Sequence, residues 1–273
     1  MKLPGKQAYS LMKTFSVCLA LIGLCVITAK AQTDITNSYQ IGVGSTRLLD
    51  TYLSQEKFKG TGLTLLNTQE RCRPSSQWAT VIQHQLDLAS LKDRSGSRKE
   101  QQADYQFFMG RYYQWFCRER FSLQAGALAT VNLGATYNSA NSNNPVQARF
   151  SLQLMPSAAA TWSFLLFHRQ AALRYQVDLP LVGVMFSPNY GQSYYEIFSL
   201  GNYDHNVVPT TFVSTPNLRQ QLSFDCRLGS SFTLRIGYLG DYRQSDVNHL
   251  KSHIYSHRLM VGFVHSFTVS NRL

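Results

Sequence analysis

The sequence predicts an all-β protein: a transmembrane, antiparallel, up-and-down β-barrel of about ten strands, with eight or twelve as alternatives. Residues 121–137 alternate apolar side chains with polar or small ones, Leu128 excepted. This period of two describes a strand with one apolar and one polar face. Similar segments recur to the end of the chain, and its beginning has the pattern of an export signal. Strands between lipid and a wet lumen need this pattern.

The first 31 residues have the features of a secretory signal peptide. Three lysines precede an apolar run over 15–27, and Ala29-Lys30-Ala31 is a small-x-small cleavage site. The run is shorter than the roughly 20 residues that a membrane helix needs. We therefore expect residues 1–31 to direct export through the Sec pathway, with cleavage before Gln32, and residues 32–273 to form the barrel.

The rest of the chain offers no apolar stretch long enough for a membrane helix, because polar residues interrupt each one. A closed barrel is the other spanning structure that satisfies every backbone N–H and C=O group. The 15 tyrosines, 16 phenylalanines and 3 tryptophans would supply aromatic girdles, and only 15% of residues are charged. The sequence thus predicts the outer membrane of a Gram-negative cell.

Ten segments carry the alternation, the first two more weakly than the others. In the sixth segment the pattern keeps its phase across Pro156, which predicts one bent strand, because proline cannot donate a ladder hydrogen bond. The predicted strands cover 43–53, 61–71, 77–89, 103–116, 121–137, 146–166, 173–181, 218–228, 232–243 and 255–267.

The connections alternate between short and long, as in outer-membrane barrels with both chain ends in the periplasm. The short ones cover 72–76, 117–120, 167–170 and 229–230, and the longer ones cover 91–102, 138–145, 187–216 and 246–253. The longer set is therefore predicted outside the cell. The final strand contains Gly262–Phe267, which resembles the signal read by the barrel-assembly machinery, a predicted partner.

Charged residues follow the predicted inward face of adjacent strands. They are Arg149, Arg174, Asp178, Arg219, Asp225, Arg227, Arg235, Asp241 and Arg243. Opposite charges on neighbouring strands can pair and fill the lumen, or the arginines can line an anion-preferring channel. A ten-stranded barrel is narrow, which favours the filled lumen.

The segment 187–216 is the longest connection and the candidate ligand-binding loop. Its candidate binding residues are Tyr190, Tyr194, Tyr195, Glu196, Phe198 and Tyr203. Long irregular loops are often functional, and clustered tyrosines suit a surface glycan or peptide. The alternative is that the loop packs over the barrel as a lid.

Two stretches resemble an uncharacterised family of exported proteins from the Bacteroidetes, treated as a domain of unknown function. The first is Leu49-Asp50-Thr51-Tyr52-Leu53-Ser54 followed by Lys59-Gly60-Thr61-Gly62-Leu63, and the second runs from Leu179 to Phe198. The resemblance implies no activity and no functional residue.

Residues 1–31 hold four lysines and no acidic residue, so the net charge of +11 falls to +7 without them. A basic balance suits lipopolysaccharide phosphates at the membrane surface, although arginines lining the lumen explain it equally well. No pattern indicates a cofactor, a metal site or nucleic acid. The histidines lack the serine spacing of lipid-acyl hydrolases, and Asp204-His205 with Asp246 and His249 lacks a surrounding omptin motif.

The sequence therefore predicts an outer-membrane barrel without catalytic residues, either structural or surface-binding. A narrow channel for small solutes is the first alternative. The second is a barrel enzyme, either lipid-modifying or an omptin-like protease. Cys72 and Cys117 lie close enough in the predicted topology for a disulfide to be considered.

Overall fold

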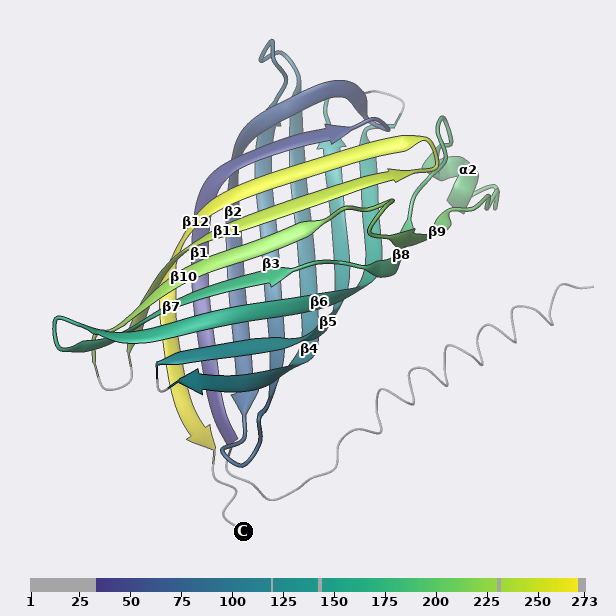
Figure 1. Ribbon diagram of the computed structural model, residues 1–273. Coiled ribbons are helices and arrows are strands. Elements are labelled where there is room, and N and C mark those ends of the chain that lie inside the picture. The colour runs from purple at the N-terminus through teal and green to yellow at the C-terminus, as the bar shows by residue number, and fades with distance from the viewer. Residues whose placement is uncertain (1–32, 119, 142–143, 230–231, 270–273) are drawn as a thin grey trace, which may run out of the picture. The chain divides into compact units, whose positions relative to one another are not determined.

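The chain folds as a closed antiparallel β-barrel, shown by a computed structural model in Figure 1. The structure describes residues 33–118, 120–141, 144–229 and 232–269. The predicted signal peptide and its cleavage site lie outside these residues. Among the described residues, no helix is long and apolar enough to cross a membrane.

Ten strands form the ring, which confirms the predicted number. In ring order they are β1 (Thr33–Asp50), β2 (Ser54–Cys72), β3 (Trp78–Lys92), β4 (Lys99–Arg118), β5 (Phe121–Asn138), β6 (Val146–Leu166), β7 (Arg169–Asp178), β10 (Leu218–Arg227), β11 (Thr233–Val247) and β12 (Leu250–Val269). The ring closes where β1 pairs with β12, from Thr33 opposite Val269 to Asp50 opposite Ser252. Both described chain ends therefore lie at one end of the barrel, here called the terminal end.

Two short strands extend the ring at the opposite end, here called the distal end. They are β8 (Val182–Phe186) and β9 (Val207–Thr211), and the helix α2 (Tyr194–Phe198) lies between them. β6 pairs with β8 over 150–154 and with β7 over 157–166, so Pro156 lies where its partner changes. The predicted loop 187–216 thus differs from the structure, which contains a helix and a strand there.

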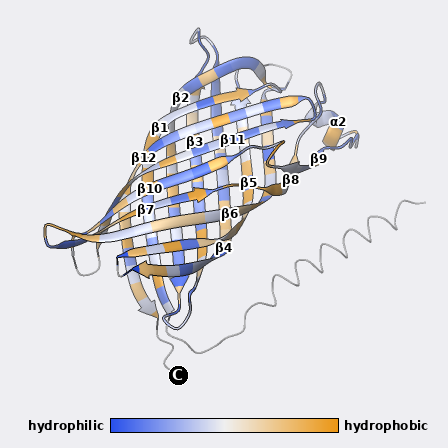
Figure 2. Cartoon of the chain, viewed as in Figure 1, coloured by the Kyte–Doolittle hydropathy of each residue, from blue (hydrophilic) through white to orange (hydrophobic). Residues whose placement is uncertain are grey.

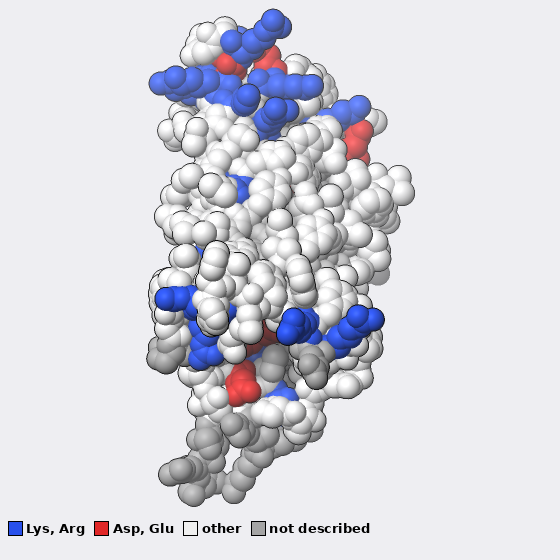
Figure 3. Space-filling view, turned by 60° about the vertical axis from the view of Figure 1, so that its left-hand side comes forward, with Lys and Arg blue, Asp and Glu red and all other residues white. Residues whose placement is uncertain are grey.

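Side chains alternate between a polar interior and an apolar exterior. On the exterior, Leu133 and Leu154 are 47% and 49% exposed, whereas Gln85 and Asp104 in the interior are 0% and 1% exposed. Blue and orange residues alternate along the strands in Figure 2, and Figure 3 shows a wide, mostly white band with few charged side chains. This inversion of the usual pattern is typical of a barrel that contacts lipid.

The strands run further at the distal end than the alternation predicts. The predicted connection 91–102 is a turn at 93–98, and 246–253 is a two-residue turn at Asn248-His249 with φ of 52° and 61°. Two positive φ values are typical of the tight hairpin turns that match strand twist. The extra strand ends reverse the pattern, because Phe58 and Leu91 lie in the interior and charged side chains such as Lys92 lie outside. The apolar outer face that marks the lipid-facing part is therefore absent there.

Candidate functional site

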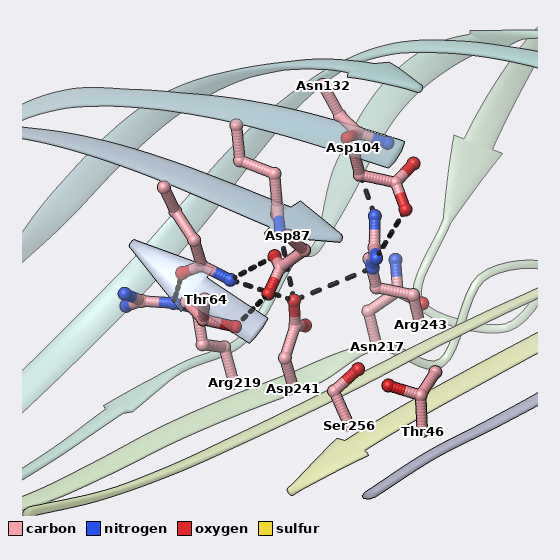
Figure 4. Close-up of polar contacts among 12 residues, drawn as sticks. Thr46, Thr64, Asp87, Asp104, Asn132, Asn217, Arg219, Asp241, Arg243 and Ser256 are labelled. Atoms are coloured by element: carbon pink, nitrogen blue, oxygen red, sulfur yellow. Dashed lines mark hydrogen bonds and ion pairs between the residues drawn. The ribbon is translucent and has the colours of Figure 1, made fainter. Parts of the chain in front are cut away.

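The lumen is bridged by polar side chains from strands on opposite sides of the ring (Figure 4). Asp241 on β11 accepts a hydrogen bond from the Gln106 amide on β4 at 2.9 Å. Arg243 on β11 donates to the Asp104 carboxylate on β4 at 3.1 Å. β4 and β11 are five strands apart in either direction around the ring, so these contacts cross its full width.

Arg219 on β10 makes a second bridge across the lumen. Its guanidinium donates to the Asp178 carboxylate at 2.7 Å and to the Gln85 side-chain oxygen on β3 at 3.1 Å. It also lies over the Phe108 ring, 4.7 Å from the centroid. Arg219 is 2% exposed, so its charge depends on the carboxylate partner for compensation.

Asp104 is shared by two arginines near the distal end. Arg149 lies 3.2 Å from one Asp104 oxygen, and Arg243 lies 3.1 Å from the other. Arg149 also lies 3.6 Å from the Asp50 carboxylate on β1. These ion pairs join β1, β4, β6 and β11.

Arg258 on β12 is 1% exposed and contacts β1 and β2. It donates to the Thr64 hydroxyl at 3.0 Å and to the Thr46 hydroxyl at 2.7 Å. Thr64 in turn is hydrogen-bonded to Asp87. The guanidinium fits because position 62 is glycine: a Cβ there would lie 2.3 Å from the Arg258 Nη2 atom.

Apolar clusters fill the lumen beside these polar bridges. One contains Val81, Phe108, Tyr112, Leu128 and Met155, a second contains Leu48, Phe58, Leu91 and Ile254, and a third contains Leu66, Leu239 and Met260. Two interior cavities have volumes of about 70 and 60 Å³ and share no lining residue. Small-molecule sites usually measure about 300–1,000 Å³, so neither cavity has that size.

Most of the predicted lumen charges meet in these bridges. Asp225 and Arg235 form a separate pair at 2.6 Å near the terminal end. Arg174 is half-buried beside the smaller cavity. Arg227 differs, because it is exposed at the end of β10 and donates to the Gln170 side chain at 2.9 Å.

Several interior residues were not among the predicted lumen charges. The most important are Asp50, Asp87, Glu100, Asp104 and Arg258, all of them inward-facing. Asp87 and Asp104 lie on the polar face of the predicted alternation, and Arg258 lies between His257 and Leu259 of the apolar face. Strand parity places Asp87 and Asp104 on the inward face, as the sequence predicts, and the same parity gives Arg258.

The connection between β8 and β9 packs against the distal rim; its residues 187–206 are here called the cap. The Tyr194 hydroxyl donates to the Gln147 side chain at 2.8 Å and accepts from the Ala148 N–H at 2.7 Å. Its ring packs edge-on against Tyr52 at 5.6 Å and is parallel to Phe198 at 6.1 Å. Burial raises the pKa of Tyr194 above its ordinary value, so the hydroxyl stays protonated and keeps its donor role.

Further hydrogen bonds hold the cap, both within it and from the neighbouring turns. Ser193 and Glu196 form a reciprocal capping box at the start of α2. The Asn248 amide in the β11–β12 turn donates to the Ser187 and His205 carbonyls, both at 3.1 Å. Tyr52 donates to the Gln192 carbonyl at 3.1 Å, and burial raises its pKa to about 12.

The predicted binding residues of the cap divide into two groups. Tyr194 and Glu196 make contacts that hold the cap itself. The other four rings are between 63% and 71% exposed, namely Tyr190, Tyr195, Phe198 and Tyr203; these are here called the exposed rings. The structure thus gives an anchored segment whose four other aromatic side chains face solvent. Figure 1 shows its helix α2 beside β8 and β9.

The residues considered for catalysis have simpler contacts. His205 and Asp204 are 2.6 Å apart and highly exposed, and Asp246 pairs with Lys251 at 3.6 Å. Cys72, Cys117 and Cys226 are free, so the considered disulfide between Cys72 and Cys117 is absent. In the described part of the chain, no group of histidine, cysteine or acidic residues could hold a metal ion.

The family described as "Protein of unknown function (DUF3316)" matches residues 13–272. The chain belongs to this family. Its membership agrees with the resemblance to an uncharacterised family, whereas the origin in the Bacteroidetes stays a prediction. A search of curated proteins found no match to this chain.

Solved structures similar to this family member include three bacterial proteins. The outer membrane protease OmpT from Escherichia coli has a TM-score of 0.45 and 7% identity over 86% of this chain and 96% of its own. The transport unit of the autotransporter AIDA-I from Escherichia coli has a TM-score of 0.43 and 9% identity over 100% of both chains. The translocator domain of NalP from Neisseria meningitidis has a TM-score of 0.37 and 12% identity over 96% and 97%.

Proposed function

We propose that this protein is a bacterial outer-membrane barrel with a closed lumen, and that its cap binds a glycan or peptide outside the cell. The observation that carries the binding proposal is the cap, in which the anchored Tyr194 holds a segment whose exposed rings face solvent. Large exposed aromatic groups on a monomer are typical of interaction sites, and tyrosine is enriched at binding hot spots.

The membrane location is supported by the surface of the barrel. Strands of 15 to 21 residues, such as β3 and β6, exceed the roughly 9–11 residues that cross a bilayer. The excess would lie mostly at the distal end, so the cap would stand clear of the lipid. Export of the chain stays a prediction from the sequence.

The bridged lumen supports a role at the surface over one as a channel. Contacts such as Gln106 to Asp241 and Arg219 to Gln85 cross the ring, and water and solutes would have to displace them. The enzyme alternatives have less support, because His205 and Asp204 are exposed and hydrogen-bonded to each other without a third polar partner.

The test of the binding proposal is a screen of the purified barrel against arrays of neutral oligosaccharides and of extended peptides. We expect binding to one array that Tyr195→Ala with Phe198→Ala reduces at least tenfold. The matched control is Phe167→Ala, which removes an 88% exposed ring from the turn at the terminal end. Absence of binding to both arrays, or an equal loss in the control, would contradict the proposal.

The orientation is tested separately by labelling with a membrane-impermeant maleimide on whole cells, in a background without Cys72, Cys117 and Cys226. A cysteine replacing Asn202 in the cap should be labelled on intact cells. A cysteine replacing His168 in the β6–β7 turn should be labelled only after the outer membrane is opened. The reverse result would place the cap in the periplasm.

A further inference from the structure

Four cations lie side by side on the outer surface of β1 to β4, near the distal end. The register pairs Arg47 with Lys59, Lys59 with Lys92, and Lys92 with Lys99. These four residues are here called the cation row. Figure 3 shows positive side chains gathered at this end, with a few acidic ones among them, above the mostly uncharged band.

The cation row points away from the lumen. All four side chains are exposed, whereas their chain neighbours Leu48, Phe58, Leu91 and Glu100 are buried in the interior. Like charges directly opposite each other on neighbouring strands destabilise a sheet. Folding alone therefore gives no reason for three such pairs in succession.

Carboxylates do not compensate this charge. In the described ranges of the chain, none of the eight ion pairs involves a member of the cation row. Lys251 on β12 is also exposed at the distal end, yet it pairs with Asp246 at 3.6 Å. Within the described residues the cation row is thus an array without carboxylate partners, whereas Lys251 has one.

The surface below the cation row changes in two steps toward the terminal end. Two residues along each strand lies a row of neutral polar side chains, Ser45, Thr61, Ser90 and Gln101. Two residues further lies an apolar row, Val43, Leu63, Leu88 and Ala103. With a strand rise of about 3.3 Å per residue, the cations lie about 13 Å along the strands from the apolar row.

This order of charged, neutral polar and apolar side chains along the strands matches one class of ligand. An amphiphile with acyl chains, a sugar-like polar region and anionic phosphates would place each part against its counterpart. Phosphate forms strong charge-assisted hydrogen bonds with lysine and arginine. A soluble anion would use the cations and leave the other two rows without a role.

We propose that the cation row binds the phosphates of a phosphorylated glycolipid in the outer leaflet of the membrane. The site lies on the outer face of β1 to β4 and does not depend on the cap, which β8 and β9 carry. Loss of glycan or peptide binding by the cap would therefore leave this proposal intact. It does depend on the barrel spanning the outer membrane.

The test uses bisphosphorylated lipid A added to the detergent-purified barrel, with bound lipid counted by native mass spectrometry. We expect wild-type protein to bind it, and Lys59→Gln with Lys92→Gln to weaken binding at least tenfold. Lys251→Gln is the matched control and should bind as wild type, because its charge is already paired. Both substituted sites are exposed, and the gel shift between unheated and boiled protein verifies folding of each variant.

Two further probes distinguish the source of the phosphate. Lipid A without phosphates should bind at least tenfold more weakly than the bisphosphorylated form. Inorganic phosphate at the same concentration should not displace the lipid. Equal binding of both lipids, displacement by inorganic phosphate, no lipid binding by wild type, or unchanged binding by the double variant would each overturn the proposal.

Discussion

Four arginines inside the barrel lie against carboxylates, namely Arg149, Arg219, Arg235 and Arg243, whereas the cation row on its outer surface lies against other cations. Arg219 and Arg243 each have an aspartate within about 3 Å, and both arginines are largely withdrawn from solvent. Lys59 and Lys92 face each other in exposed positions without a carboxylate partner. Burial explains the difference, because an unpaired charge is costly in the interior and tolerable in water.

The comparison separates two roles for charge in one barrel. The interior pairs compensate each other and bridge the lumen, so their removal should affect stability. The exterior cations gain little from each other, so their removal should affect binding and leave stability unchanged or improved.

The largest expected effect is that of Asp104→Asn. This change leaves Arg149 and Arg243 without their shared carboxylate, and breaking a buried pair typically costs about 3–5 kcal/mol. Urea unfolding of the detergent-solubilised barrel measures the change in the free energy of unfolding. Asp246→Asn, which breaks the exposed pair with Lys251, is the control and should cost less than about 1 kcal/mol. Similar losses in both variants would remove the distinction between interior and exterior charge.

The next effect is steric. Gly62→Ala would place a methyl group against the Arg258 guanidinium, which hydrogen bonds to Thr46 and Thr64 hold in place. We expect a loss of about 1–3 kcal/mol in the free energy of unfolding, as is usual for overpacking. Gly229→Ala is the control, because a Cβ there has no neighbour within 4 Å. An unchanged stability of the Gly62 variant would show that Arg258 moves aside freely.

The smallest effect has the opposite sign. Lys92→Glu would place a carboxylate opposite both Lys59 and Lys99, replacing two repulsive pairs by attractive ones. Cross-strand pairs contribute about 0.2–1 kcal/mol each, so this variant should unfold at slightly higher urea. It should also lose the phosphorylated lipid. A variant that is less stable and still binds lipid would contradict the account of the cation row.

The sequence predicted the ring because lipid contact leaves a regular trace. The alternation in 121–137 and its counterparts gave the ten strands, and the predicted single strand across Pro156 is confirmed. The distal strand ends left no such trace, since their outer face is polar and apolar residues such as Phe58 and Leu91 face inward. The strand β9 was missed because Pro209 interrupts it.

The sites were less predictable than the fold, because they depend on register. Arg47 and Lys99 are distant in sequence, and only the pairing of four strands places them in one row. The interior pairs were partly predictable, since strand parity gives the face but not the partner across the lumen. The anchoring role of Tyr194 could not be separated from the exposure of Tyr195 by composition alone.

The closed lumen is the central claim, and planar-bilayer recording of the wild-type barrel tests it most directly. Contacts across the ring, such as Arg243 to Asp104, should prevent stable unitary conductance. An open control is Asp104→Ala combined with Arg219→Ala and Arg243→Ala, which removes several of these bridges and should conduct if it folds. Absence of unitary steps in the wild type is the predicted result. Stable conductance whose ion selectivity reverses on Arg219→Glu would show that the lumen is a channel and would contradict the claim.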